Sequence, residues 1–409
     1  MGLLDILKRT VAPSRPDTRQ VYRASVQDRY SSYPSAGLTP GRLSAIFQAA
    51  DMGDIRAQME LYEEMEEKDA HLASTLQTRK VAVQGMNYRI VSYSDDPRDR
   101  EIADFIDEVI ASLEFDRIIM DILDALGKGF SVNEIIWEVK DGRVVVEDIQ
   151  WITPKRVSFV EDDRPQILDA KGISSIQPPE WKLIFHRCSL RSGSVLRAGL
   201  LRTVAWVYLF KNYALKDWNV FNEVYGMPLR VGRYEPTSSP EDRESLKRAI
   251  ASLGSDAAAI ISKNTEIEFV EAHGRGGGQE NPFIAMAEFC NREMSKAILG
   301  QTLTTDVSNA TGTYSAARVH HQVRKDIIRS DADNLAASLR MQLFKPLVGF
   351  NYGWQDKLPY LEFYFDEEVD LKKTSETYKN LNEMGIKIPL EHIAEVFALP
   401  KVDRVGGQA

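Results

Sequence analysis

The stretch from Asn281 to Pro346 constrains the fold of this chain most, because it predicts two long helices joined by a polar loop. Asn281 is suited to cap the first helix, and Pro282 follows at the first helical position, where its missing N–H costs no hydrogen bond. Apolar residues then recur at steps of three and four as far as Gly300, which gives the helix one apolar face. The second helix is expected from about Ser315 to Pro346, far beyond the usual three turns.

The segment between these helices, Gln301 to Tyr314, consists largely of Thr, Ser, Asn, Gly and Ala. Long loops with few apolar residues are often functional elements. We therefore expect this loop to be a mobile functional element.

Composition excludes several classes of protein. The chain has 409 residues, 43% of them apolar and 27% charged, which is typical of a globular protein with two or three domains. A net charge of -9 argues against a clamp that neutralises DNA phosphates, but not against a protein that lets DNA pass. Only Cys188 and Cys290 are present, too few for a disulfide framework, which fits a reducing compartment. No signal peptide or bilayer-spanning run is evident, so we expect a soluble intracellular protein without membrane contact.

Two regions come before the long apolar helix. Residues 1–40 are rich in proline and arginine, which leaves two interpretations open: a disordered terminus, or an extended arm that docks on a neighbouring subunit. Residues 41–195 predict an α+β body, with three helices up to Gln84 and a strand near 86–94. A helix opened by Asp96 and a hairpin at Asp141–Gly142 follow. The acidic run in residues 60–67 is interpreted as a solvated helix face rather than a functional acidic surface.

The segment from Leu196 to Tyr225 predicts a long helix that is apolar on all sides over residues 200–210. Such a helix is buried all round, in a core or between subunits. Residues 228–280 then predict a small βαββ insert that ends in a glycine-rich linker. After Pro346 we expect one strand, near 359–365, and two closing helices.

A search for catalytic patterns finds none with the required spacing. The sequence has no phosphate-binding G-x-x-x-x-G-K-[ST] and no G-x-S-x-G motif, and Gly274–Gly278 is interpreted as a linker. His320 and His321 are adjacent, so they cannot share one helix face as metal ligands. Asp331 and Asp333 are the carboxylates on which a metal-dependent nuclease would depend, and this stays an alternative hypothesis. No cofactor or metal is expected.

The basic residues of the helix after Ser315 also allow two interpretations. They either form a solvated, salt-bridged surface, which is favoured, or face a polyanion or another subunit.

The order of a long helix, a small insert, a return helix, a polar loop and a very long helix resembles that of bacteriophage portal proteins. The amino-acid sequence itself is similar to that of the Mu-like phage portal family over nearly all of residues 55–350. The stretches that carry the resemblance include LDALGKGFSVNEIIWE, LLRTVAWVYLFKNYALKDWNVFNEVYGMPLRVGRY and EFCNREMSKAILGQTLTTDVSNATGTYSAARVHHQVRKDIIRSDADNLAASLRMQLFKPLV.

The resemblance implies a portal fold, a homo-oligomeric ring of twelve subunits at one capsid vertex, and no enzymatic activity. Double-stranded DNA would pass through the ring during packaging and ejection. The implied partners are the terminase large subunit, a head–tail adaptor, and the major capsid and scaffold proteins. The implied location is the virion, with assembly in the host cytoplasm. Another ring-forming head-completion or scaffold protein is the alternative.

The resemblance also implies a division of the chain into named parts. These are an N-terminal arm (1–40), a wing (41–195), a first stem helix (196–225), a clip (226–280), a second stem helix (281–300), a tunnel loop (301–314), a long wing helix (315–346), and a C-terminal part of the wing or a reduced crown (347–409).

Two sets of candidate site residues follow from this division. The tunnel-loop residues expected to face DNA are Thr302, Thr304, Thr305, Asp306, Ser308, Asn309, Thr311 and Thr313. The clip residues expected to contact terminase or adaptor are Arg233, Tyr234, Glu235, Arg243, Lys247, Lys263 and Asn264. The tunnel loop has no Lys or Arg, so it could touch DNA without gripping its charge.

Overall fold

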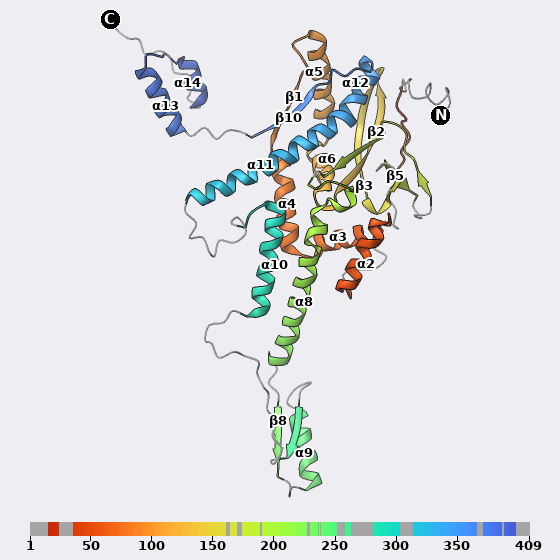
Figure 1. Cartoon of the computed structure of the whole chain (residues 1–409), viewed down its shortest axis with the longest axis vertical. Coiled ribbons are helices and arrows are strands. Elements are labelled where there is room, and N and C mark those ends of the chain that lie inside the picture. The colour runs from red at the N-terminus through yellow and green to blue at the C-terminus, as the bar shows by residue number, and fades with distance from the viewer. Residues whose placement is uncertain are drawn as a thin grey trace. The chain divides into compact units, whose positions relative to one another are not determined.

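The computed structural model of the chain describes residues 15–23, 36–160, 164–169, 174–188, 190–226, 230–235, 237, 239–251, 258–262, 281–302, 314–365, 371–386 and 388–397. It divides into two compact units (Figure 1). Unit 1 comprises Met1–Gly85 and Arg89–Glu362, and unit 2 comprises Met86–Tyr88 and Phe363–Ala409. Unit 1 contains runs of helices and a run of strands, from β2 to β7, which agrees with the predicted mixed α+β class.

The helices agree closely with the expected segments. They are α2 (Pro40–Asp51), α3 (Arg56–Lys68), α4 (Ala70–Gln84), α5 (Pro97–Ala111), α6 (Phe115–Ile122), α7 (Ala125–Lys128), α8 (Leu200–Gly226), α9 (Pro240–Ala251), α10 (Pro282–Leu299), α11 (Tyr314–Leu339), α12 (Lys345–Tyr352), α13 (Leu371–Glu383) and α14 (Leu390–Val396). The predicted caps are confirmed for two of them: Asp96 accepts the Arg98 N–H at the start of α5, and Asn281 accepts the Phe283 N–H at the start of α10.

The described strands form four small sheets. The strands are β1 (Asn87–Val91), β2 (Phe130–Lys140), β3 (Arg143–Ile152), β4 (Val157–Val160), β5 (Arg164–Leu168), β6 (Ser175–Ile176), β7 (Leu183–Arg187), β8 (Arg230–Tyr234), β9 (Ala258–Ser262) and β10 (Tyr360–Tyr364). Their orders are β3-β2-β7, β4-β5-β6, β1-β10 and β8-β9. The predicted hairpin joins β2 to β3, with φ of 52° at Asp141 and 79° at Gly142, as a two-residue type I′ turn requires.

The main core lies where β2 meets α3 and the first half of α8. Phe130 and Val132 of β2 are fully buried in one apolar cluster with Tyr62 of α3 and with Leu201 and Tyr208 of α8. Burial of side chains of this size supplies roughly 1.5–3 kcal/mol each. The first half of α8 is therefore anchored in the body formed around β2 and α3, and the second half extends from it.

The described part of the arm, residues 15–23, packs on its own chain. Glu134 of β2 is fully buried and accepts hydrogen bonds from the backbone N–H groups of Val21 (2.6 Å) and Tyr22 (2.7 Å). The Nζ of Lys182 lies 3.5 Å from the same carboxylate. The expected docking of the arm on a neighbouring subunit concerns the rest of residues 1–40 and stays a prediction.

The interpretation of the acidic run as a solvated face is wrong. Glu64 of α3 is fully buried and Glu60 is 5% exposed, because basic side chains meet the run from several elements. Glu64 pairs with Lys68, and Glu63 lies 2.8 Å from Lys155 of the turn before β4. These pairings neutralise charges that would otherwise be too costly to bury.

The expectation that the long helix ends at Pro346 is also wrong. Residues Arg340–Phe344 form a π-helical turn in which the Lys345 N–H donates to the Arg340 C=O, and α12 continues from there to Tyr352. Pro346 therefore lies in the first turn of α12, where a missing N–H is tolerated. The same turn presents Gln342 to β7, where its side-chain amide bonds both the N–H (2.7 Å) and the C=O (2.9 Å) of Phe185.

The small insert is a βαβ module in the residues that the structure describes. Strands β8 and β9 are parallel, with Arg230 opposite Ala258, and α9 connects them. Ser239 caps α9 by accepting the Asp242 N–H at 3.1 Å. The third strand expected in this insert, near 266–270, lies outside the described residues.

Candidate functional site

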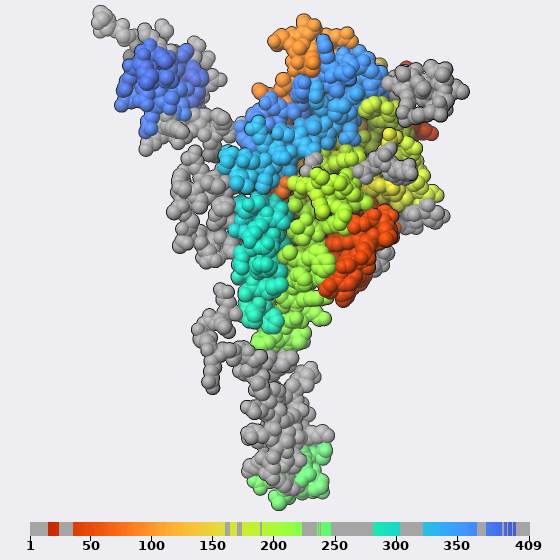
Figure 2. Space-filling view, in the orientation of Figure 1, coloured from red at the N-terminus to blue at the C-terminus, as the bar shows by residue number. Residues whose placement is uncertain are grey.

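The candidate site consists of the paired helices α8 and α10 and the loop that follows α10. The two helices run antiparallel and pack along each other (Figures 1 and 2). Their far ends meet through Phe221 and Phe283, whose ring centroids are 5.7 Å apart. The insert of residues 227–280 follows the end of α8 and precedes the start of α10, so it is joined to the body through these two helices.

Helix α4 holds the near ends of the pair in the body. Asp69 caps α4 and also accepts two hydrogen bonds from Lys211 of α8, at 2.7 and 2.9 Å. In the first turn of α4, His71 Nε2 lies 2.8 Å from the hydroxyl of Ser295 on α10. Burial lowers the pKa of His71, so this contact involves a neutral imidazole near pH 7. These polar contacts fix α8 and α10 to one support.

Both helices expose large apolar side chains in the single chain. On α8 these are Phe210 (43% exposed), Tyr213 (36%) and Val220 (49%), and on α10 they are Ile284 (37%), Met286 (36%) and Phe289 (49%). Of the two environments expected for residues 200–210, complete burial in the core of one chain does not hold, since Phe210 is exposed, and burial between subunits stays a prediction. Exposed apolar sets of this kind mark contact surfaces for other proteins.

Arg79 of α4 joins the two helices that flank the loop. Its Nη1 donates to the C=O of Ile298 in the last turn of α10, at 2.6 Å. Its Nε and Nη2 donate to the carboxylate of Asp331 on α11, at 2.7 and 2.9 Å. Both side chains are buried, and a bidentate pair of this type fixes orientation as well as distance.

The root of the loop is tightly packed on the α10 side. Gly300 ends α10 in the left-handed conformation, with φ of 68° and its N–H bonded to the Lys296 C=O. A Cβ at this position would lie 2.8 Å from Cδ1 of Ile327 on α11. Gln301 is buried and Thr302 is half-buried.

Of the expected tunnel-loop residues, the structure describes only Thr302. Thr304, Thr305, Asp306, Ser308, Asn309, Thr311 and Thr313 lie outside the described residues, so their expected position facing DNA stays a prediction. What the structure defines is the spacing of the two helices between which they lie.

Five of the seven expected clip residues are described, and they lie on β8, directly after it, or on α9. Arg233 and Tyr234 end β8, opposite Ile261 and Ser262 of β9. Glu235 follows as an exposed residue, and Arg243 and Lys247 lie four residues apart along α9. Lys263 and Asn264 lie outside the described residues.

The carboxylates proposed for a nuclease do not form a metal site. Asp331 is bound to Arg79, whereas Asp333, two residues further along α11, is exposed. Within the described ranges, no group of three or more His, Cys, Asp or Glu side chains could hold a metal ion. Cys188 and Cys290 are free and buried, and burial raises the pKa of the Cys188 thiol to about 11, so it is a poor nucleophile. No helix in the described part of the chain combines the length and apolarity that crossing a bilayer requires.

Sequence reasoning missed Arg79, although a signal for it was present. Leu72, Leu76 and Val83 define the buried face of α4, and Arg79 falls on that face at the same three- and four-residue steps. An arginine on an apolar face requires a buried acceptor. The pattern could have predicted such an acceptor but not its identity.

Comparison with known proteins identifies the family. Residues 59–399 match the family model described as the portal protein of Mu bacteriophage, a structural rather than enzymatic family. The chain is 33% identical over 383 residues to the Mu-like prophage FluMu protein gp29 of Haemophilus influenzae, covering 92% of this chain and 73% of that protein. It is 33% identical over 387 residues to the portal protein of Escherichia phage Mu, covering 92% of this chain and 74% of that protein.

Two solved structures share the fold at low sequence identity. One is a chain in the neck of an empty gene transfer agent particle, with a TM-score of 0.50, 13% identity, and coverage of 81% of this chain and 90% of that one. The other is a chain in the virion of a native gene transfer agent particle, with a TM-score of 0.51, 11% identity, and coverage of 88% and 99%. From the family model and the relatives together, the chain belongs to the portal protein family of Mu bacteriophage.

Proposed function

We propose that this portal protein assembles into a closed ring of twelve identical subunits that conducts double-stranded DNA at one vertex of the capsid. The observation that carries the proposal is the exposed apolar surface on both α8 and α10. The two exposed sets lie on different helices, so the α8 set of one subunit can pack against the α10 set of the next. A contact between two different patches repeats around an axis, and it closes into a ring when the rotation allows.

The family and the described elements support an assignment of parts. We assign α8 and α10 as the stem helices, residues 226–280 as the clip, residues 301–314 as the tunnel loop, and residues 41–195 and 315–346 as the wing. Residues 347–409 supply the C-terminal wing or a reduced crown. Residues 347–362 belong to unit 1 and residues 363–409 to unit 2, so the last part is shared between the two units.

The charge distribution supports a conduit rather than a clamp. The net charge is -9, and residues 301–314 contain Asp306 but no Lys or Arg. On α10, Arg292 and Lys296 lie 3.8 and 2.6 Å from Glu288 and Glu293. Pairing within the helix reduces their attraction for phosphate, which keeps the barrier to DNA sliding low.

The remaining partners follow from the proposed place in the particle. The βαβ module would dock the terminase large subunit during packaging and the head–tail adaptor afterwards, through Arg233, Arg243 and Lys247. The wing would contact the major capsid and scaffold proteins during assembly in the host cytoplasm.

Mass photometry and negative-stain microscopy of the purified chain test the ring directly. We expect rings with a central hole and a mass of about twelve times the 46.2 kDa subunit. Phe289→Asp should shift the distribution toward monomer, because it places a charge in the proposed contact. The matched control is Met52→Asp, since Met52 is an apolar residue that is 88% exposed but lies after α2. A ring population unchanged by Phe289→Asp, or reduced equally by Met52→Asp, would contradict the assigned contact.

A further inference from the structure

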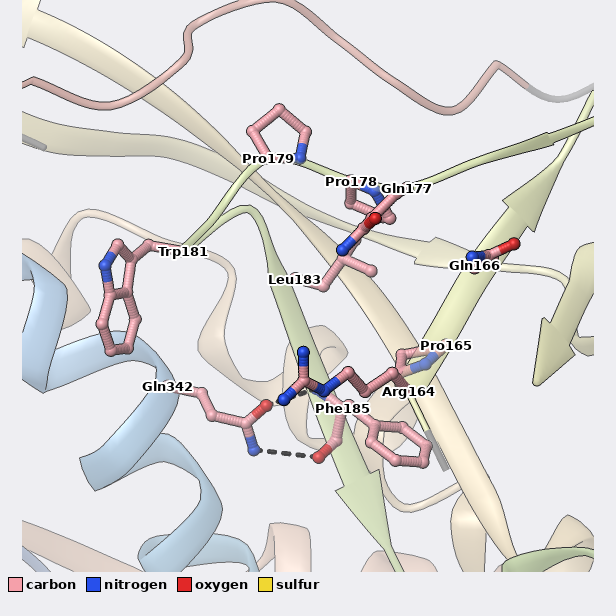
Figure 3. A pocket seen from close by; sticks show the side chains of 10 residues that line it. All are labelled: Arg164, Pro165, Gln166, Gln177, Pro178, Pro179, Trp181, Leu183, Phe185 and Gln342. Atoms are coloured by element: carbon pink, nitrogen blue, oxygen red, sulfur yellow. Dashed lines mark hydrogen bonds between the residues drawn. The ribbon is translucent and has the colours of Figure 1, made fainter. Parts of the chain in front are cut away.

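A groove of about 460 Å³ lies beside the edge of β7 and is bordered on its other side by β5 (Figure 3). Its apolar walls include Trp181, Leu183 and Pro179, and Arg164 lies at its β5 side. The volume falls within the ~300–1,000 Å³ range of ligand-binding clefts. Nothing in the proposed conduit function uses this groove.

The edge of β7 offers backbone hydrogen bonds to this groove. The Ile135 N–H donates to the Lys182 C=O at 2.8 Å, which makes that pair a hydrogen-bonded one in the antiparallel ladder of β2 and β7. By alternation, the N–H and C=O of Leu183 and Phe185 point away from β2. The N–H and the C=O of Phe185 are both hydrogen-bonded to the side-chain amide of Gln342 (Figure 3). The Leu183 groups have no such partner among the described residues.

Trp181 adds a strained backbone to the same place. It has a φ of 62°, which is costly for a residue with a bulky side chain. Its C=O accepts from Trp137 at 2.8 Å, and its ring packs on Trp354 with centroids 5.2 Å apart, turned away from Leu183 and Arg164 (Figure 3). Backbone strain of this kind is kept at functional sites, which favours a role for the groove.

We propose that residues 3–7 of the same chain occupy this groove as an added strand on the Leu183 edge. The described arm leads to the groove, because the Asp17 C=O accepts from Lys182 Nζ at 3.2 Å, and Lys182 lies between Trp181 and Leu183 in the sequence. The nine residues between Leu7 and Asp17 can span up to ~30 Å when extended, so the segment is tethered within reach. Added strands bind through the backbone and gain specificity from alternate side chains.

The side chains of the segment match the groove. Residues 3–7 read Leu-Leu-Asp-Ile-Leu, which supplies apolar residues for the walls formed by Trp181 and Pro179. Asp5 is the only acidic residue in positions 1–14, and Arg164 has no carboxylate partner in the described part of the chain. An ion pair between Asp5 and Arg164 sets the register of the strand. For residues 3–7, docking on the same subunit replaces the expectation of docking on a neighbour.

Hydrogen exchange at single-amide resolution tests the added strand. In the full chain the Leu183 amide should be protected, and in the Leu4→Asp/Ile6→Asp variant its exchange should accelerate by about tenfold or more. The Phe185 amide, held by Gln342, should not change. Val11→Asp is the matched control, because it places a charge in the same arm outside the docked segment. Equal exchange at Leu183 in the full chain and the double variant would overturn the proposal.

A cysteine pair identifies which copy supplies the segment. Leu4→Cys with Gln177→Cys, a residue that lines the groove, should form a disulfide under mild oxidation and migrate as a monomer in a non-reducing gel. The native Cys188 and Cys290 are buried, so they interfere little. Leu4→Cys with Met52→Cys is the control pair and should not cross-link. Covalent dimers, or no disulfide at all, would overturn docking on the same subunit. Neither result depends on ring formation, so this proposal can fail while the portal function stands.

Discussion

The guanidinium of Arg79 and the carboxylate of Asp331 form a buried bidentate ion pair, at 2.7 and 2.9 Å, between helices 252 residues apart in the chain. The same guanidinium bonds the Ile298 C=O at the end of α10. One side chain of α4 thus fixes both helices from which the proposed tunnel loop departs. This contact fixes the last turn of α10 against α11 at Asp331, which lies 17 residues after the start of α11 at Tyr314.

We predict that breaking this pair from one side destabilises the protein strongly. Asp331→Asn should lower the free energy of unfolding by about 3–5 kcal/mol, because it leaves a buried guanidinium without its charge partner. Replacing both residues, as Arg79→Met/Asp331→Leu, should cost less than the sum of the single changes. Chemical denaturation of the unchanged protein, Arg79→Met, Asp331→Leu and the double variant measures the coupling.

The exposed pair of Arg89 and Glu362 is the matched control for that cycle. Its atoms are equally close, at 2.8 Å, but the side chains are 64% and 48% exposed. Its coupling should not exceed about 1 kcal/mol. Similar coupling in both pairs would show that burial does not govern the Arg79 contact.

Local sequence signals predicted much of this fold. The caps Asp96 and Asn281 and the Asp141–Gly142 turn depend on neighbouring residues, and the structure confirms them. The family was likewise predicted from sequence similarity over a long stretch of the chain, and the comparisons confirm the family.

Several of the errors involve a contact that is distant in sequence. Glu63 of the acidic run lies against Lys155, and the continuation of the helix through Pro346 accompanies the contact of Gln342 with β7. The support given by Arg79 depends on Asp331. Periodicity identifies which side of a helix is buried, but it does not identify what lies against that side.

The buried His186 predicts a loss of stability in acid. Burial lowers its pKa to about 4, whereas an unfolded histidine titrates near 6.5. Between these values the unfolded chain binds more protons, so the contribution is complete above pH 6.5 and is lost as the pH falls toward 4. The loss should reach about 3 kcal/mol. His186→Gln should flatten this part of the stability–pH curve, whereas the exposed His392→Gln should leave it unchanged. An identical acid slope in all three proteins would refute the assignment.

Glu134 should decide whether the arm stays bound to the body. Glu134→Gln removes the charge that faces the buried Lys182 and weakens the bonds from Val21 and Tyr22, so we expect a loss of about 3 kcal/mol or more. Trypsin should then cleave after Arg19 or Arg23 sooner than in the unchanged protein. Glu138→Gln, an exposed change on the same strand, should leave the cleavage rate as it was. Equal cleavage rates for Glu134→Gln and the unchanged protein would mean that the carboxylate does not retain the arm.

Gly129 is predicted to be far less replaceable than Gly53, although both have positive φ. A Cβ at Gly129 would lie 2.2 Å from the Val195 C=O just before α8, whereas a Cβ at Gly53 would meet nothing within 4 Å. Gly53→Ala therefore measures backbone strain alone, at roughly 1–2 kcal/mol. Gly129→Ala adds a backbone clash and should lower the free energy of unfolding several-fold more. Thermal unfolding of the two variants separates the cost of backbone strain from the cost of the clash. Equal losses of unfolding free energy would show that the backbone before α8 shifts to relieve the clash.

The charge of the proposed tunnel loop offers the most direct functional prediction. If residues 301–314 face DNA in the ring, Thr305→Lys/Ser308→Lys should convert a loop that lets DNA slide into one that holds it. Each phosphate that a lysine contacts should steepen the fall of log affinity with log salt by about 0.9. Binding of double-stranded DNA to purified rings, measured across a salt series, gives this slope. The double variant Asp104→Lys/Asp107→Lys on α5 raises the net charge by four rather than two, so it is a stringent control for a general increase in positive charge. The proposed loop position would be wrong if both double variants changed the slope equally.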